Sequence, residues 1–150
     1  MAITQAMATS FKVEMLDGFH NFGVGVIRAS TAADVFKIAL YTSSATLSAT
    51  TTAYTTSNEV ATAGGYTAGG NTLAISQVPT STTTTAWLDF TDSTWTAATI
   101  TANGAMIYNS TQGNKCVAIL AFGGDKTSTA GDFTIIFPTA DSTSAIIRIA

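Results

Sequence analysis

The sequence predicts an all-β protein, an antiparallel β-sandwich of seven to eight strands with jelly-roll-like topology. Three observations support this fold. Apolar and polar residues alternate over short runs, as they do in half-buried strands. Stretches rich in glycine, proline and hydroxyl residues separate the runs, and helical periodicity never extends beyond about two turns. Since two half-apolar sheets must cover each other, strands at this spacing favour a sandwich.

Residues 1–21 are expected to form an N-terminal arm on a single domain that spans residues 1–150. A chain of 150 residues is long enough to bury a core without disulfides. Around residues 11–16 the pattern fits either a strand or a short helix. The opening "MAITQAMATSFKVEML" has neither the cationic start nor the apolar run of a secretory signal, so we expect synthesis in the cytoplasm without export.

The first clear strand is "VFKIALYT" at residues 35–42, whose one face carries Phe36, Ile38 and Leu40. The connection that follows, residues 42–70, is rich in threonine and alanine and only weakly patterned. It predicts a short helix near Asn58 and Glu59. A connection of this length in a compact domain is usually functional or partly ordered.

The remaining strands follow the same alternation. They are expected in "NTLAISQV" (71–78), "TAWLDF" (85–90), "DFTIIFP" (132–138) and "SAIIRIA" (144–150). The stretch "GAMIYNSTQGNKCVAILAFGGD" (104–125) predicts a strand, a tight polar turn and a second strand. "GGDKTSTAG" (123–131) is expected to be a connection, and Pro79 and Pro138 to lie at strand ends.

Several strands are apolar on both faces, which a two-layer monomer would leave partly in water. Trp87 opposes the face of Leu88, Met106 and Tyr108 oppose Ile107, and Ile146 opposes Ile147. Either another subunit or partner covers these side chains, or the N-terminal segment folds over them. On the first alternative, the interface residues expected are Trp87, Met106, Tyr108 and Ile146, with Phe11 and Phe19 in an arm that grips the neighbour.

Composition and charge exclude several classes of partner. Charged residues make up 10% of the chain against 46% hydrophobic residues, and the net charge is -3 with no basic cluster, so nucleic acid is not an expected partner. The longest apolar runs, such as 116–122, are too short to span a bilayer, so no membrane contact is expected. Cys116 is the only cysteine, so no internal disulfide forms.

Residues that carry chemistry are sparse, and no catalytic, cofactor-binding or metal-binding residue is expected. The single histidine, His20, lies in "DGFHNFGVG", which indicates a turn with a hydrogen-bonded or exposed ring. One histidine and one distant cysteine do not make a zinc site. The carboxylate pairs Asp89/Asp92 and Asp125/Asp132 would suit an acid-pair hydrolase, but they fit structural turn carboxylates better. The chain is therefore not expected to be an enzyme.

Three stretches resemble a family of small structural proteins of tailed bacteriophages. They are residues 36–60 ("FKIALYTSSATLSATTTAYTTSNEV"), residues 64–74 ("GGYTAGGNTLA") and residues 100–150, from "ITANGAMIYN" to "SAIIRIA". The resemblance extends from about Phe11 to the C-terminus, and its motifs contain no catalytic residues. It implies a virion component, first of all a capsid decoration or cement protein that binds the major capsid protein and itself, as a dimer or trimer.

Other roles remain open for such a protein. The resemblance also fits a tail, neck or head-fibre component. A module that binds host-surface glycans is a further alternative, because Trp87, Trp95, Tyr54 and Tyr66 would suit a platform on which sugar rings stack. Packing in a core or interface is the more frequent use of such rings.

Overall fold

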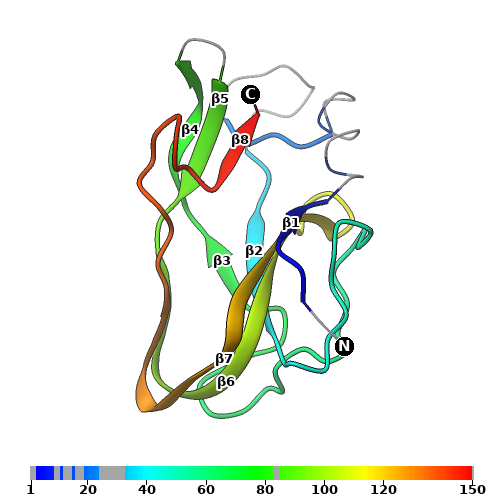
Figure 1. Ribbon diagram of the computed structural model, residues 1–150, viewed down its shortest axis with the longest axis vertical. Coiled ribbons are helices and arrows are strands. Elements are labelled where there is room, and N and C mark those ends of the chain that lie inside the picture. The colour runs from blue at the N-terminus through cyan, green and yellow to red at the C-terminus, as the bar shows by residue number, and fades with distance from the viewer. Residues whose placement is uncertain are drawn as a thin grey trace.

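The computed structural model describes residues 3–8, 11, 15, 19–23, 33–82 and 85–149, apart from the side chain of Ser81. These residues form an all-β fold of two antiparallel sheets (Figure 1). The first sheet has the strand order β1 (Ala6–Met7), β7 (Lys115–Ile135), β6 (Ser93–Asn109), β2 (Phe36–Tyr41) and β3 (Asn71–Leu73). The second has the order β4 (Ile75–Thr82), β5 (Thr85–Phe90) and β8 (Ile147–Ile149). The prediction of an all-β sandwich is confirmed, and the jelly-roll connectivity stays a prediction.

Aromatic side chains join the two sheets in the core. Phe36 on β2 stacks on Phe22 with 4.2 Å between ring centroids, and it lies 5.8 Å from Phe90 on β5. Phe90 in turn lies 6.1 Å from Phe137. Phe36, Phe90 and Phe137 all belong to the faces that the alternation assigned to the interior, so the binary pattern placed the core correctly.

β6 and β7 form one long, bent hairpin around the turn at residues 110–114 (Figure 1). The prediction of a connection at 123–131 is wrong, because β7 runs through it and merges the two strands expected at 115–122 and 132–138. β6 begins at Ser93, well before the expected start at 104. Threonine explains both differences: it suits strands as well as loops, and its hydroxyls pair across the hairpin, as in Thr101 and Thr127 with 3.1 Å between the Oγ1 atoms.

The strand expected at 71–78 is divided at Ala74 between the two sheets, as β3 and β4. Pro79 lies inside β4, so its expected place at a strand end is wrong. β4 tolerates it because β4 is an edge strand of the second sheet and its pairing with β5 is irregular between Gln77 and Thr80.

Residues 42–70 cover the outer face of the first sheet, and we call this segment the cover. The Tyr54 ring stacks on Tyr108 with 4.6 Å between centroids, and the Tyr41 hydroxyl donates a hydrogen bond of 2.6 Å to the Thr55 carbonyl. The helix expected near Asn58 is wrong, since Asn58 has a left-handed φ of 59° and the segment is irregular throughout. Contacts with residues distant in the same chain hold this segment in place instead.

The described part of the expected arm packs on the domain. Ala6 and Met7 pair with β7, and Phe11 is fully buried against His20. Phe11 and Met15 are both helical, and the rest of residues 11–16 lies outside the described residues. Ile3 lies beside Gly104 and bridges to Leu47, so the N-terminus contributes to the outer layer but the cover makes most of it.

Gly70, at the end of the cover, provides a test of this packing. It has a φ of +68°, and a Cβ atom there would overlap the Ile38 carbonyl oxygen of β2. We predict that Gly70→Ala lowers the free energy of unfolding by about 3 kcal/mol or more, measured by urea denaturation. The matched control is Gly113→Ala in the β6–β7 turn, where φ is +65° and the space is open; it should cost only about 1 kcal/mol. Equal losses in the two variants would contradict close packing of the cover on β2.

Candidate interaction surface

The carboxylates of the two predicted pairs hold the fold together. Three of them accept a hydrogen bond from another part of the chain: Asp92 Oδ1 from the Phe137 N–H (2.9 Å), Asp125 Oδ1 from the Asn103 amide (2.8 Å) and Asp132 Oδ1 from the Ala97 N–H (3.1 Å). The last two contacts join β6 to β7. Their use is structural, but the predicted place in turns is wrong for Asp125 and Asp132, which lie within β7.

Asp89 differs from the other carboxylates because it is buried. It is only 1% exposed, and its Oδ1 accepts a hydrogen bond of 2.8 Å from the Phe90 N–H. Burial raises the pKa of Asp89 above its usual value of 3.8. Its Oδ2 and the indole N–H of Trp87, two positions earlier on the same strand face, are buried without a hydrogen-bond partner among the described residues. On the outward face of β5, Asp89 and the indole N–H of Trp87 are therefore shielded from solvent, although the Trp87 side chain as a whole is only half-buried.

His20 is part of a polar cluster that fastens the arm to the β6–β7 turn. Its Nδ1 lies 2.9 Å from the Asn109 amide nitrogen, and the same nitrogen donates to Asp34 Oδ2 at 2.8 Å. Gln112 donates to the other oxygen of Asp34 at 3.2 Å, and the Asn21 N–H donates to Oδ2. The hydrogen-bonded ring expected for His20 is what the structure contains, and the cluster positions the arm.

Three of the six expected interface residues are buried within the chain itself. Met106 and Phe11 are fully buried and Tyr108 is 3% exposed, so their expected availability to a partner is wrong. The physical reason is the cover, which occupies the face that Met106 and Tyr108 share. Tyr66 and Trp95 are also buried, so they do not form an exposed platform for sugars.

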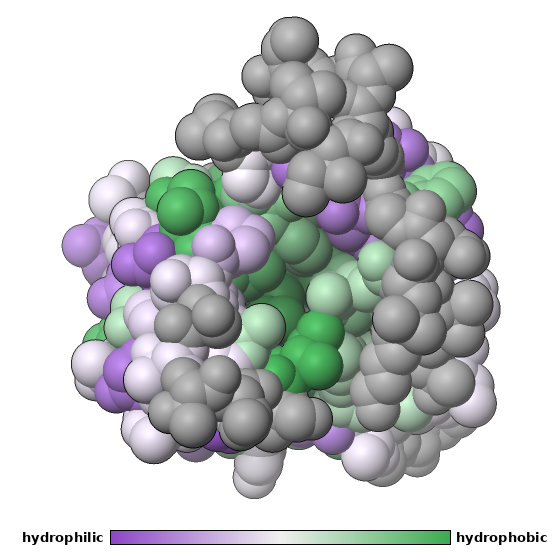
Figure 2. Space-filling model, turned by 90° about the horizontal axis from the view of Figure 1, so that it is seen from above, coloured by the Kyte–Doolittle hydropathy of each residue, from purple (hydrophilic) through white to green (hydrophobic). Residues whose placement is uncertain are grey.

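The other three expected residues reach the surface to different degrees. Trp87 and Ile146 are half-buried, and Phe19 is 37% exposed with the Lys115 ammonium 5.0 Å from its ring centroid. Trp87 lines a small apolar hollow of about 80 Å³ together with Pro79. Figure 2 shows apolar side chains gathered in the middle of the molecule when it is seen from above.

Glu59 holds the cover together from within. Its Oε2 accepts a hydrogen bond from the Tyr54 hydroxyl, and its Oε1 accepts one from the Tyr66 hydroxyl and one from the Gly69 N–H, all at 2.6 Å. The Tyr108 hydroxyl donates to the Gly69 carbonyl at 2.8 Å. We call these five residues the Glu59 cluster. Because the Glu59 carboxylate accepts three short hydrogen bonds, it fixes the three parts of the cover that carry the donor groups.

Tyr66 of the Glu59 cluster and the neighbouring Val60 also fasten the cover to the edge of β2, beyond the residues that pair with β3. The Tyr66 hydroxyl accepts a hydrogen bond of 3.0 Å from the Leu40 N–H of β2, and the Val60 N–H donates to the Leu40 carbonyl at 2.9 Å. Both backbone groups of Leu40 therefore bond to the cover. Burial, with the negative charge of Glu59 nearby, raises the pKa values of Tyr54 and Tyr66 far above the usual 10.0, and burial raises that of Tyr108 to about 12.

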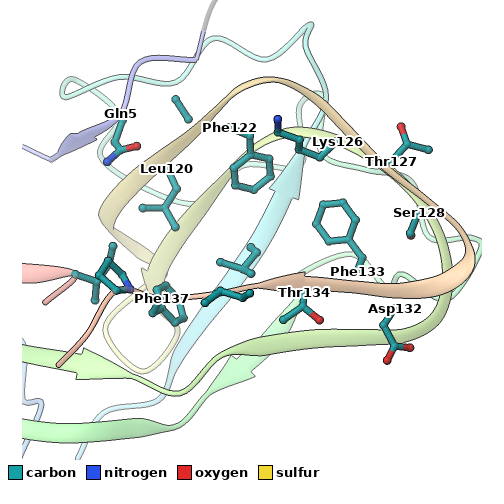
Figure 3. A pocket seen from close by; sticks show the side chains of 15 residues that line it. Gln5, Leu120, Phe122, Lys126, Thr127, Ser128, Asp132, Phe133, Thr134 and Phe137 are labelled. Carbon is teal, nitrogen blue, oxygen red and sulfur yellow. The ribbon is translucent and has the colours of Figure 1, made fainter. Parts of the chain in front are cut away.

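A hollow of about 570 Å³ lies inside the bend of β7 (Figure 3). We call it the β7 hollow. Its apolar lining consists mainly of Leu120, Phe122, Phe133, Ile135 and Phe137, and the rings of Phe122 and Phe133 face each other with 6.4 Å between centroids. Lys126 and Asp132 line it from opposite sides of the bend.

The sequence analysis did not identify Ile136, an exposed side chain that lines this hollow. Ile136 lines the β7 hollow and is 76% exposed, the highest value among the large apolar side chains described. The signal was present in "TIIFP": with Ile135 and Phe137 turned inward, the alternation leaves Ile136 outside. The alternation also places Ile146 on an outer face, and Ile146 lines the same hollow.

The described residues contain no cluster of three or more metal-ligating side chains, and none of their helices is long and apolar enough to cross a membrane. No protein-family model, curated protein or solved structure matches this chain. The class that the observations define is therefore a fold class, an all-β sandwich with a third, irregular layer over one sheet.

The tyrosines give a pH-dependent test of the cover. All four tyrosines of the chain, at positions 41, 54, 66 and 108, have raised pKa values because they are buried. A raised pKa in the folded state means that the stabilisation is complete below pH 10 and is lost as the pH rises above 10. We predict that absorbance at 295 nm shows no tyrosinate between pH 10 and 11, and then a single cooperative rise that coincides with unfolding.

The control for this titration is the chain in denaturant, whose tyrosines should ionise near pH 10. If the folded chain instead titrates one or more tyrosines near pH 10 while its circular dichroism is unchanged, those hydroxyls are solvated and the Glu59 cluster does not close the cover.

Proposed function

We propose that this chain is a non-enzymatic structural protein of a tailed-bacteriophage virion, and specifically a capsid decoration or cement protein. In this role it binds the outer surface of the major capsid protein shell and stabilises it. The resemblance of residues 36–60, 64–74 and 100–150 to small phage structural proteins is the starting point of the proposal. The chain would be made in the host cytoplasm and act on the capsid surface.

The observation that carries the proposal is the character of the β7 hollow, which offers packing surface rather than reactive groups. Its lining is mostly apolar, and two of its polar side chains are already engaged: Ser128 donates to the Ala98 carbonyl at 2.8 Å and Asp132 accepts from the Ala97 N–H. Surfaces of this kind serve protein contacts. A hydrolase would instead need a nucleophile or acid pair free to meet a substrate.

The way the fold is stabilised also suits a particle that persists outside cells. Buried aromatic rings, the Glu59 cluster and threonine pairs across the β6–β7 hairpin hold the described residues together, and the single cysteine makes no internal disulfide. Changes in redox potential therefore leave these contacts intact. On a shell, many copies bind repeated sites, so modest contact energy per copy is multiplied when the copies self-associate.

The test of this function is to locate the chain in an image reconstruction of the virion of the phage that encodes it. We predict density for this sandwich on capsomers over the whole shell. Capsids assembled without the protein should lack the density and should release DNA at a lower temperature. A few copies at a single vertex or along the tail would contradict decoration and assign the chain to a neck, tail or fibre. Absence from purified virions would contradict any structural role.

A further inference from the structure

We propose that the β7 hollow is the docking surface for a second copy of this chain, in a two-fold dimer where Ile136 of each copy enters the hollow of the other. This inference deepens the proposed function by naming the surface of self-association. It concerns the purified chain alone, so it can be tested without any capsid.

The first argument is that one surface carries both a hollow and a side chain that can fill it. The floor of the hollow is apolar and largely buried, while Ile136 beside it is 76% exposed. A two-fold contact uses the same patch on both copies, so that patch must contain both the projecting group and its receptor. The most exposed large apolar side chain of the described residues therefore lies at the rim of the β7 hollow.

The second argument is charge complementarity within the same patch. Lys126 and Asp132 are both exposed, and they line the hollow from opposite sides of the β7 bend. A two-fold axis that passes between them sets Lys126 of each copy opposite Asp132 of the other. Two reciprocal ion pairs at the rim then fix the orientation of the dimer, whereas most of the binding energy comes from Ile136 and the aromatic floor.

Packing into the hollow, rather than pairing of strand edges, is the mode that β7 allows. Beyond Ile119, β7 pairs only with β6 among the described strands, so its other edge is open. Gly123 and Gly124 have positive φ, and Ala130 has a φ of 48° where the ladder with β6 shifts register. Such irregularities twist an edge and prevent a long second ladder. Side chains that insert into the bend need no regular edge.

The experiment measures the oligomeric state of the full chain by sedimentation equilibrium. We expect a dimer whose dissociation constant rises at least about tenfold in Ile136→Ser, since a buried aliphatic anchor is lost. The matched control is Val78→Ser, an equally simple truncation of a 45% exposed side chain on β4, outside the hollow. Circular dichroism shows whether each variant is folded. A monomeric wild-type chain, or equal effects of the two substitutions, would overturn the proposal.

A charge-swap experiment tests the two-fold arrangement separately from the Ile136 anchor, with circular dichroism to check each variant, because Asp132 also accepts a hydrogen bond from the Ala97 N–H. Lys126→Glu and Asp132→Lys should each weaken the dimer, because each sets like charges opposite each other across the axis. Mixed in equal amounts, the two variants should form a heterodimer as tight as wild type to within about threefold, since both ion pairs are restored. Failure of the mixture to associate while both variants remain folded would overturn the two-fold arrangement.

The outcomes separate the dimer from the capsid role. If the wild-type chain is monomeric and Ile136→Ser loses only capsid binding, the hollow belongs to the capsid protein and the dimer is wrong. If the dimer behaves as expected but the chain is absent from virions, the proposed function is wrong and the dimer stands.

Discussion

The structure depends on the need to bury both faces of the first sheet. β2 and the parts of β6 and β7 next to the 110–114 turn are buried on both faces, and the second sheet can cover only one of these faces. The chain covers the other face itself with a third layer, the cover, which is threonine-rich and irregular. An irregular layer needs partners for its backbone. The Glu59 carboxylate and the tyrosine hydroxyls provide them, so one acidic side chain organises a layer that has no regular secondary structure.

Sequence reasoning identified the sheets far better than the cover. Strict alternation at Phe36, Ile38 and Leu40 made β2 visible, and the same pattern located β5 and β8. Threonine-rich stretches could not be resolved in this way, because the same residues form the ladder of β7 and the loops of the cover. The alternation also indicated that something must cover the outer face of the first sheet. It could not show which part of the chain makes that layer, since that depends on contacts such as Tyr54 on Tyr108 between residues far apart.

The cover changes where a partner can bind. Met106 and Tyr108 looked like a free outer face, and in the folded chain that face is occupied. The apolar surface that remains lies inside the bend of β7, where the sandwich is open and Ile136 projects. A chain that completes one face by itself and leaves the β7 hollow open offers a partner a defined surface on which to pack. That arrangement suits a component of a regular shell, in which each copy must meet its neighbours in the same way.

The claim that the cover is an integral layer of the core is tested most directly by native-state hydrogen exchange at the Leu40 amide, which donates to the Tyr66 hydroxyl of the cover rather than to a strand. We predict that this amide exchanges only through global unfolding, with the same opening free energy as the Ile107 amide of β6, the central strand of the first sheet. An opening free energy for Leu40 several kcal/mol below that of Ile107 would show that the cover lifts off a sheet that is stable without it, and would contradict the account.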